Sequence, residues 1–329
     1  MSEDRDDWER QAEMLVNRIR KNRRRLTPWL EAERVTCFRL YDRDIPELPL
    51  VVDWYEGRLH VSHLPRGGEG EPSEPDARPA GADDDRAELL AARIAAALGV
   101  PGDRVHLKRR AKAPGGTQYE RLARGGDEIE IREGGLRFLV NLTDYVDTGL
   151  FLDHRITRRL VSAEARGRRF LNLFAYTGTF SVYAAAAGAL STTTVDLSQR
   201  YLDWAERNLG LNGLASTAHT FVRDDVMAAL EDGRVTGRYD LVVVDPPTVS
   251  RSKRMRRPFD VQRDHAALLR GVLGVAAPGG VIYFSTNLRR FALDFDPRDA
   301  ASIEDVTAKT IPPDFRDPKA HRCFRIVKR

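Results

Sequence analysis

The segment 169–196 constrains the fold of this chain more than any other stretch. An apolar run over 170–174 leads into a small-residue turn around Gly178, an alanine-rich helix pattern follows, and a second short run ends on Asp196. This order predicts a strand, a tight loop, a helix and a second strand with an acid at its tip. In an open parallel sheet such a unit binds a nucleoside-bearing ligand, because the glycine lets the backbone approach the ligand and the carboxylate accepts hydrogen bonds from two ribose hydroxyls.

Two cofactor classes share this architecture, and the glycine content of the loop separates them. A dinucleotide site normally carries G-x-G-x-x-G, because the pyrophosphate lies against bare backbone at the helix N-terminus. Only one of those glycines, Gly178, is present here. A ligand with a ribose and a methionine end but no phosphate fits this loop better, so the segment predicts S-adenosylmethionine. The alternative is a plain βαβ packing unit without a ligand.

A second strand pattern brings an acid to the same edge of the predicted sheet. Residues 239–244 have the sequence YDLVVV, which is typical of a buried parallel strand, and Asp245, Pro246 and Pro247 follow directly. The two prolines fix the backbone and donate no N–H, so they hold the preceding carboxylate where ligands bind in open sheets. We therefore predict a methyltransferase with Asp245, Pro246 and Pro247 as its catalytic residues.

Strand and helix patterns alternate from residue 170 onward, which predicts the fold class. We expect an α/β, doubly wound, Rossmann-like domain over 144–329 with a mostly parallel seven-stranded sheet. The third strand ends at Asp224 and Asp225, where an acid can accept from the adenine amine. The strand patterns are 170–174, 191–195, 219–222, 239–244 and 281–285, and the helix patterns are 179–187, 199–211, 225–230 and 261–273.

The residues before this domain predict a basic helical segment over 1–32 and a small α+β domain over 33–143. The stretch 65–85 is rich in Pro, Gly, Glu and Asp, which predicts a mobile loop. Lys108 to Lys112 include a basic cluster that makes this domain a candidate for RNA contact. The strand patterns are 35–40, 50–61, 105–110, 128–132 and 136–141, and the helix pattern is 87–98.

Composition narrows the setting of the protein. The two cysteines, Cys37 and Cys323, belong to no disulfide framework or metal spacing, and the start of the chain does not have the pattern of a signal peptide, so we expect a cytoplasmic protein. No apolar segment approaches the roughly 20 residues of a membrane span. The seven histidines show no ligand spacing, so we expect no metal site.

Two basic runs are candidates for RNA binding, because net charge itself is only +4. One lies in the N-terminal helix pattern, where acids are missing from 17–29, and the other is the loop 250–257, SRSKRMRR, which follows the Asp-Pro-Pro motif. A single-sign face suits a polyphosphate partner, although a solvated face is the ordinary alternative. The predicted RNA-binding residues are Arg20, Lys21, Arg23, Arg24, Arg25, Lys253, Arg254, Arg256 and Arg257.

Several long motifs resemble one enzyme family over nearly the whole chain. DTGLFLDHR, FLNLFAYTGTF, VVVDPPTVSRSKRM and IYFSTNLRRFALD are similar to the C-terminal half, RlmK, of the fused bacterial 23S ribosomal RNA guanine methyltransferases called RlmKL, and that half makes 7-methylguanine. The fused enzymes also carry a THUMP domain and a guanine-N2 methyltransferase half. Because these are not in the sequence, we expect substrate capture to rest either on this chain or on a separate protein that supplies their functions. Val249 stands where the family usually has Phe.

The resemblance also implies a set of cofactor contacts. These contacts come from the strand-end loop, from the acids after the strands and from a wall over the methionine end. The wall is the DTGLFLDHR motif, whose polar residues lie densely around Phe151 in the sequence. The predicted cofactor-binding residues are Thr148, Gly149, Phe151, Arg155, Asn172, Phe174, Ala175, Tyr176, Thr177, Gly178, Asp196, Leu197, Ser198, Asp224, Asp225, Val226 and Asp245.

The predicted reaction is direct methyl transfer to guanine N7 of 23S ribosomal RNA or a large-subunit assembly intermediate. Cytosine-C5 methylation needs a cysteine thiolate, and no cysteine lies between Tyr41 and Arg322. Guanine N7 has a lone pair and no proton to lose, so alignment suffices and no histidine or cysteine is expected at the site. Two alternatives remain: methylation of the exocyclic amine N2, with Asp245 accepting, and a non-catalytic RNA-binding assembly factor.

Overall fold

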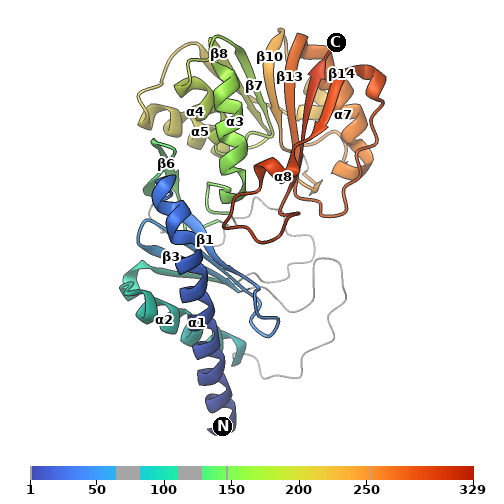
Figure 1. Ribbon diagram of the computed structural model, residues 1–329. Coiled ribbons are helices and arrows are strands. Elements are labelled where there is room, and N and C mark those ends of the chain that lie inside the picture. The colour runs from blue at the N-terminus through green and yellow to red at the C-terminus, as the bar shows by residue number, and fades with distance from the viewer. Residues whose placement is uncertain (1, 64–81, 110–127, 146, 253) are drawn as a thin grey trace. The chain divides into compact units, whose positions relative to one another are not determined.

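A computed structural model describes residues 2–63, 82–109, 128–145, 147–252 and 254–329 (Figure 1). The chain divides into two compact units, the first made of Met1–Glu133 and Val140–Thr148, the second of Gly134–Leu139 and Gly149–Arg329. The compact units thus divide at positions other than residue 143, and the domain boundary expected there stays a prediction. None of the described helices is long and apolar enough to cross a membrane.

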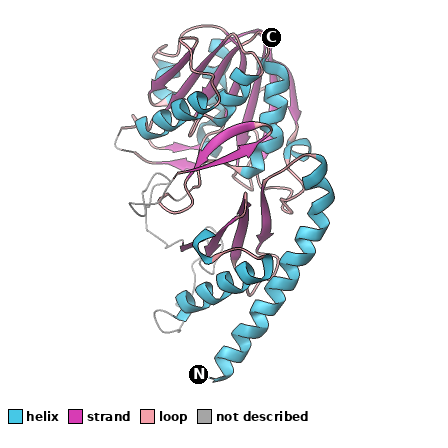
Figure 2. Cartoon of the chain, turned by 90° about the vertical axis from the view of Figure 1, so that its left-hand side faces the viewer, coloured by secondary structure: helices cyan, strands magenta, loops and turns pink. Residues whose placement is uncertain are grey.

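The first unit is a four-stranded sheet with two helices on one face. Its strands run in the order β1-β2-β3-β4, with β3 and β4 parallel and the other pairs antiparallel. Leu15, Ile19 and Leu26 recur at helical spacing on α1 and pack into the core with Ile94 of α2. The two helices lie beside each other (Figure 2). The bounds are α1 Ser2–Ala32, β1 Cys37–Asp42, β2 Leu50–Tyr55, β3 Arg58–His63, α2 Ala82–Leu98, η1 Gly102–Arg104 and β4 Val105–Arg109.

The predicted loop 65–85 is wrong at its end. Helix α2 begins at Ala82, so residues 82–85 are helical. The helix therefore begins five residues before the apolar pattern that starts at Ala87. The rest of the predicted loop lies outside the described residues.

The short strand β6, Leu136–Val140, is fastened within the second unit by side chains of a helix. It follows β5, Ile129–Glu133, after a turn at Gly134 and Gly135, both with positive φ. Trp204 Nε1 donates to Leu139 O at 3.1 Å, and Asn208 and Asn212 accept from the backbone N–H groups of Leu139 and Arg137 at 2.9 Å. These three side chains are spaced four residues apart on one face of α5 and its C-cap residue Asn212, so they satisfy backbone groups of β6.

The second unit contains the predicted seven-stranded sheet, which confirms the α/β fold class. Its order is β14-β15-β13-β10-β7-β8-β9, with β15 antiparallel to both of its neighbours. The strands β7, β8, β9, β10 and β13 are mutually parallel in adjacent pairs. The bounds are β7 Arg169–Leu173, β8 Ser191–Asp196, β9 His219–Arg223, β10 Tyr239–Val244, β13 Ala276–Thr286, β14 Ala300–Asp305 and β15 Arg322–Lys328.

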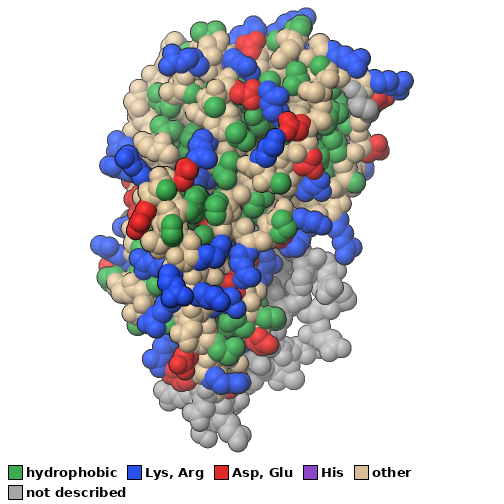
Figure 3. All heavy atoms as spheres, viewed as in Figure 1, with side chains coloured by type: hydrophobic (Ala, Val, Ile, Leu, Met, Phe, Trp, Pro, Cys, Tyr) green, Lys and Arg blue, Asp and Glu red, His purple; other side chains and the backbone are tan. Residues whose placement is uncertain are grey.

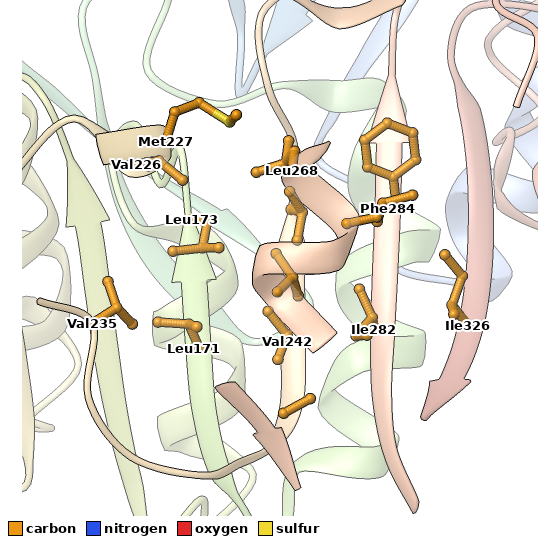
Figure 4. Close-up of a cluster of buried hydrophobic side chains, with 14 of the residues drawn as sticks. Leu171, Leu173, Val226, Met227, Val235, Val242, Leu268, Ile282, Phe284 and Ile326 are labelled. Carbon is orange, nitrogen blue, oxygen red and sulfur yellow. The ribbon is translucent and has the colours of Figure 1, made fainter. Parts of the chain in front are cut away.

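Helices cover both faces of this sheet (Figure 1). One face carries α3, α4 and α5, where Val161, Phe170 and Leu241 form a buried cluster. The other face carries α6 and α7, where alternate residues of the same strands, such as Leu171 and Val242, are buried (Figure 4). The bounds are η2 Leu152–His154, α3 Arg155–Ala165, α4 Thr179–Ala186, α5 Gln199–Leu211, α6 Val226–Glu231, β11 Val249–Ser250, β12 Phe259–Asp260, α7 Val261–Val275, η3 Pro297–Asp299 and α8 Thr307–Thr310.

Candidate active site

The loop after β7 has an unusual backbone. Phe174 and Tyr176 have φ of 56° and 50°, and Gly178 has φ of 69°, so alternate residues adopt the left-handed conformation. Each such conformation costs a residue with a side chain on the order of 1 kcal/mol and persists only where its surroundings fix it. Here the Tyr176 ring packs against Phe151 and Tyr201, with centroids 5.1 and 4.6 Å away. The structure therefore holds this loop in one defined shape beside Phe151.

Gly149 and Gly178, both predicted to contact a ligand, pack so closely against α5 that a larger side chain would clash with it. A Cβ added to Gly178 would lie 2.5 Å from Cβ of Ala205, and one added to Gly149 would lie 2.5 Å from the ring of Trp204. Both residues also have positive φ, 69° and 101°. The close approach of Gly178 to Ala205 is a packing reason for glycine at this position, and the predicted approach of the backbone to a ligand stays a prediction.

Asp196 is held by the backbone around it. Its Oδ2 accepts from Tyr176 N at 2.9 Å and its Oδ1 from Ser198 N at 2.8 Å, and the residue is 5% exposed. Burial raises the pKa of Asp196 to about 6, although the hydrogen bonds from the backbone of Ser198, Tyr176 and Leu197 lower it. The carboxylate thus ties the loop after β7 to the start of α5 and keeps further lone pairs for hydroxyl donors.

The predicted wall over the methionine end is only partly assembled around this loop. Thr177 Oγ1 donates to Gly149 O at 2.6 Å, and Phe151 packs on Tyr176. Arg155 is directed elsewhere, because its guanidinium pairs with the buried Asp314 at 3.1 Å. Thr148 belongs to the first unit, where its hydroxyl hydrogen-bonds Tyr55 at 2.9 Å.

The acids after β9 already have protein partners. Asp224 pairs with Arg234 at 2.7 Å, and this hydrogen-bonded guanidinium lowers the pKa of Asp224. Asp225 caps α6 by accepting from Met227 N at 3.1 Å, and its other oxygen accepts from Arg256 N at 3.1 Å. Val226 is buried in the core. The structure therefore gives all three residues a structural role beside the predicted cofactor role.

The remaining predicted cofactor residues divide between the loop and the interior. Asn172 is 1% exposed, and its amide donates to Ser181 at 3.0 Å within a buried polar network, so its side chain is not at the strand end. Ala175 N donates to Val195 O at 3.0 Å, which joins the two loops. Leu197 and Ser198 follow Asp196 directly and are half-buried.

Asp245 is held by side chains from remote parts of the sequence. Ser285, at the end of β13, donates to its Oδ1 at 2.6 Å. His154, at the end of η2, has Nε2 3.4 Å from its Oδ2. Pro246 is buried behind it, and 22% of the Asp245 side chain is exposed. The predicted catalytic residues therefore lie at the end of β10, where Ser285 hydrogen-bonds one carboxylate oxygen of Asp245 and His154 Nε2 lies 3.4 Å from the other.

His154 is the functional candidate that the sequence analysis missed, and the expectation of no histidine at the site is wrong. The residue is 5% exposed, and its ring stacks on that of His321, with centroids 4.5 Å apart and planes 12° from parallel. Burial lowers the pKa of His154, against the charges of Asp245 and Asp153, which raise it. Polar residues are dense at 153–155, but no local pattern in the sequence connects His154 with Asp245, because only the tertiary fold brings the two residues together.

Asp153, His154 and His321 form the candidate metal cluster found among the described residues, with one ligand atom of each within 4.8 Å of the others. A metal ion lies near the plane of each imidazole that binds it, along the nitrogen lone pair. Two stacked rings only 12° from parallel do not direct their lone pairs to one point. Asp153 is also bonded to His321 Nδ1 at 3.0 Å. The geometry therefore suits a hydrogen-bonded pair better than a single bound ion.

Comparison with known protein families assigns the chain to one of them. The family described as S-adenosylmethionine-dependent methyltransferase matches residues 38–326. The chain belongs to this family. The cofactor of this methyltransferase is therefore S-adenosylmethionine, and its reaction is methyl transfer.

Close relatives carry a more specific name. The methyltransferase is 50% identical over 319 residues to "Ribosomal RNA large subunit methyltransferase K/L" of Pseudomonas putida (strain W619), and 48% identical over 317 residues to the protein of that name from Syntrophotalea carbinolica. These alignments cover 97% and 96% of this chain but only 42% and 43% of the relatives. The chain thus spans less than half the length of the curated relatives it matches.

Solved structures share the fold. The methyltransferase superposes on SMU.776, crystallised as a complex with SAH, with a TM-score of 0.72 and 23% identity, over 96% of this chain and 81% of that one. A SAM-dependent methyltransferase from Agrobacterium tumefaciens gives a TM-score of 0.52 at 22% identity, over 72% and 69% of the two chains. At these identities the likeness shows the fold.

The cysteines of the methyltransferase are not placed for covalent chemistry. Cys323 is fully buried on β15, opposite Ser285 of β13. Burial, with the charges of Asp245 and Asp305, raises the pKa of its thiol far above the usual range. A thiol that stays protonated is a poor nucleophile, which agrees with a direct transfer.

The two basic runs differ in how their charges are used. Arg20, Lys21 and Arg23–25 are exposed on α1, and Lys and Arg side chains gather over this helix in Figure 3. In the loop after β11, Arg256 pairs with Asp232 and Arg257 with Glu231, both at 2.5 Å. Arg254 is exposed and forms no ion pair with the part of the chain that the structure describes, and Lys253 lies outside that part.

Proposed function

We propose that this chain methylates N7 of a guanine in 23S ribosomal RNA by direct transfer from S-adenosylmethionine. The observation that carries the proposal is Asp245, a carboxylate at the end of β10 with Ser285 bonded to one oxygen and His154 3.4 Å from the other, followed by the buried Pro246. The substrate class follows the names of relatives about 50% identical to it. The raised pKa of the Cys323 thiol favours a route without a covalent intermediate.

Asp196 and the loop 174–178 are the proposed cofactor site. The carboxylate lies at the end of β8 with both oxygens oriented by backbone N–H groups, so its free lone pairs can accept from the two ribose hydroxyls. Phe151 and Tyr176, which pack together, would cover the methionine end. Asp225 would lie near the adenine, although its carboxylate is already engaged as a helix cap.

The substrate guanine would be presented unpaired. In duplex RNA, N7 faces a deep and narrow groove that side chains cannot enter, so the base must be single-stranded or flipped. Asp245, as an acceptor, would take hydrogen bonds from guanine N1–H and N2–H while N7 points to the methyl group. Adenine does not offer donors in that arrangement, so Asp245 would select guanine.

The atom methylated is tested by chemical cleavage and by atom replacement. A fragment of 23S ribosomal RNA is incubated with the enzyme and labelled cofactor, then treated with borohydride and aniline, which cleave at 7-methylguanosine. A matched substrate with 7-deazaguanosine at that position should accept no label. Label in the deaza substrate, or label recovered as N2-methylguanosine, would reject the N7 assignment.

Methylation of the guanine exocyclic amine is the second candidate, and His154 is the observation that favours it. An amine must lose a proton when it is methylated, and a buried imidazole with a lowered pKa lies beside Asp245. Recovery of N2-methylguanosine in the experiment above would select this candidate. Cofactor binding without methyl transfer to any ribosomal RNA would indicate an assembly factor instead.

The basic segments and a separate protein would provide substrate capture. Arg20, Lys21, Arg23, Arg24, Arg25 and Arg254 are exposed, and such side chains bind phosphates. The curated relatives are more than twice as long as the region that aligns with this chain. Large-subunit assembly intermediates are the proposed substrate.

A further inference from the structure

Asp245 has two anchors of different kinds. Ser285, which is 2% exposed, donates from Oγ to Oδ1 of Asp245 at 2.6 Å. His154 Nε2 lies 3.4 Å from Oδ2. His154 belongs to η2, which precedes β7 in the chain. A carboxylate with one donor can rotate about its last bond, whereas one held at both oxygens presents a single edge to a ligand.

The ring of His154 is itself locked in place. It stacks on His321 at 4.5 Å and meets the edge of Phe180 at 5.8 Å. His321 is fully buried and bonded at both nitrogens, to Asp153 at 3.0 Å and to Thr310 Oγ1 at 2.9 Å. These contacts fix the direction in which Nε2 of His154 points.

The proton of neutral His154 belongs on Nε2. Its Nδ1 is buried and has no hydrogen-bond partner among the described residues. A proton on Nδ1 would have two costs. It would leave a buried N–H without an acceptor, and it would place the Nε2 lone pair against the Asp245 Oδ2 lone pairs, which repel it. Asp153 Oδ2 is farther away, at 3.8 Å, and already accepts from His321. The N–H of His154 is therefore directed at Asp245.

We propose that His154 is a positioning residue, whose Nε2–H holds Oδ2 of Asp245 so that the carboxylate faces the target guanine. This inference rests on the proposed function, in which Asp245 accepts from guanine. Without the second anchor the carboxylate rotates toward Ser285, and guanine is bound in fewer productive poses. The cofactor site at Asp196 is not affected.

The test is a pair of variants that differ in one N–H. H154Q places an amide N–H where Nε2 lies, and H154L removes the donor at similar size. We expect H154Q to keep kcat/KM for RNA within about 3-fold of wild type and H154L to lose about 10-fold, with the Kd for S-adenosylmethionine unchanged. In a D245N background, H154L should cost nothing further, because the coupling is between these two residues.

Three outcomes would overturn the inference. The first is full activity in H154L, and the second is an equal loss of activity from H154L with and without D245N. The third is an H154Q variant as inactive as H154L whose pH–rate profile no longer has the acidic limb of the wild type, which would make His154 a proton acceptor. Should H154L fail to fold, H154N replaces it, because its shorter amide does not reach Oδ2.

A readout without turnover separates this inference from the proposed function. In protein labelled with ¹⁵N-histidine, the ring signals of His154 should show the proton on Nε2, and D245N should shift them. A proton on Nδ1 would reject the positioning role. Wild type that shows this signal but transfers no methyl group to ribosomal RNA would instead reject the proposed function and keep the His154–Asp245 bond.

Discussion

Asp196 and Asp245 lie at the carboxyl ends of two strands of one sheet, yet they are held in opposite ways. Asp196 is oriented by backbone N–H groups of Tyr176 and Ser198, the latter two residues away. Asp245 is oriented by side chains, Ser285 from 40 residues later and His154 from a turn before the sheet begins. Asp196 is 5% exposed, while 22% of the Asp245 side chain is exposed.

This difference indicates a division of labour. Backbone donors cannot change with rotamer, so they suit a carboxylate that always binds the same cofactor. Side-chain donors from remote segments hold Asp245 while leaving 22% of its side chain exposed, which suits the residue that meets a macromolecular substrate. Changes at Asp196 should therefore alter cofactor binding, and changes at Asp245 should alter the use of RNA.

The largest effect is expected from D196A. It removes two charge-assisted hydrogen bonds to the ribose, each about 1.5–3 kcal/mol, so the Kd for S-adenosylmethionine should rise by about 100-fold or more. Calorimetry measures it. D203A removes an exposed carboxylate on α5 and serves as the control. An unchanged Kd in folded D196A would take Asp196 out of the site, and tight NADH binding by the wild type would favour a dinucleotide.

A smaller effect, on a different substrate, is expected from D245N. The amide keeps the shape but accepts through one oxygen, so about 2 kcal/mol of guanine recognition is lost and kcat/KM for RNA falls by about 30-fold. The Kd for S-adenosylmethionine should change much less than in D196A. Equal losses in cofactor affinity for the two variants would abolish the contrast between the two acids.

The pH dependence of cofactor binding should follow Asp196. Its pKa of about 6 means that the carboxylate must lose a proton to accept from the ribose, so affinity at pH 5 should be about 10-fold weaker than at pH 8. The stability of the free protein changes in the opposite direction. The folded-state pKa lies above the usual 3.8 of an aspartate, so this group destabilises the fold as the pH rises from 3.8 to about 6. D196N should remove both dependences, and a cofactor affinity that ignores pH between 5 and 8 would contradict the assignment.

The smallest effect concerns the salt dependence of RNA binding. R251S with R254S should flatten the slope of log K against log salt by about 1.5, because each exposed arginine releases close to one counterion. R256S with R257S should flatten it less, since Asp232 and Glu231 already neutralise these two. R23S, R24S and R25S test α1 in the same assay. No change in slope for any set would place the RNA path elsewhere.

Local chemistry explains what could be predicted in the fold. The runs at 239–244 and 170–174, the helix patterns between them and the acids that follow the strands depend on neighbours a few residues apart, and the structure has all of them. The strands β14 and β15 did not stand out, because β14 is largely exposed and carries little apolar alternation. The seven-stranded sheet was expected from the fold class rather than from these residues.

The sequence alone determined that a βαβ unit, an acid at the end of β8 and an Asp-Pro-Pro after β10 share one sheet edge, since hydrophobic period and turn chemistry are local. Only the tertiary structure decided what surrounds them: His154 beside Asp245, Asp314 with Arg155, and acids of α6 against Arg256 and Arg257. The physical reason is that sheet order brings together residues remote in sequence, such as Asp153 and His321, which are 168 positions apart. No local pattern records such a contact.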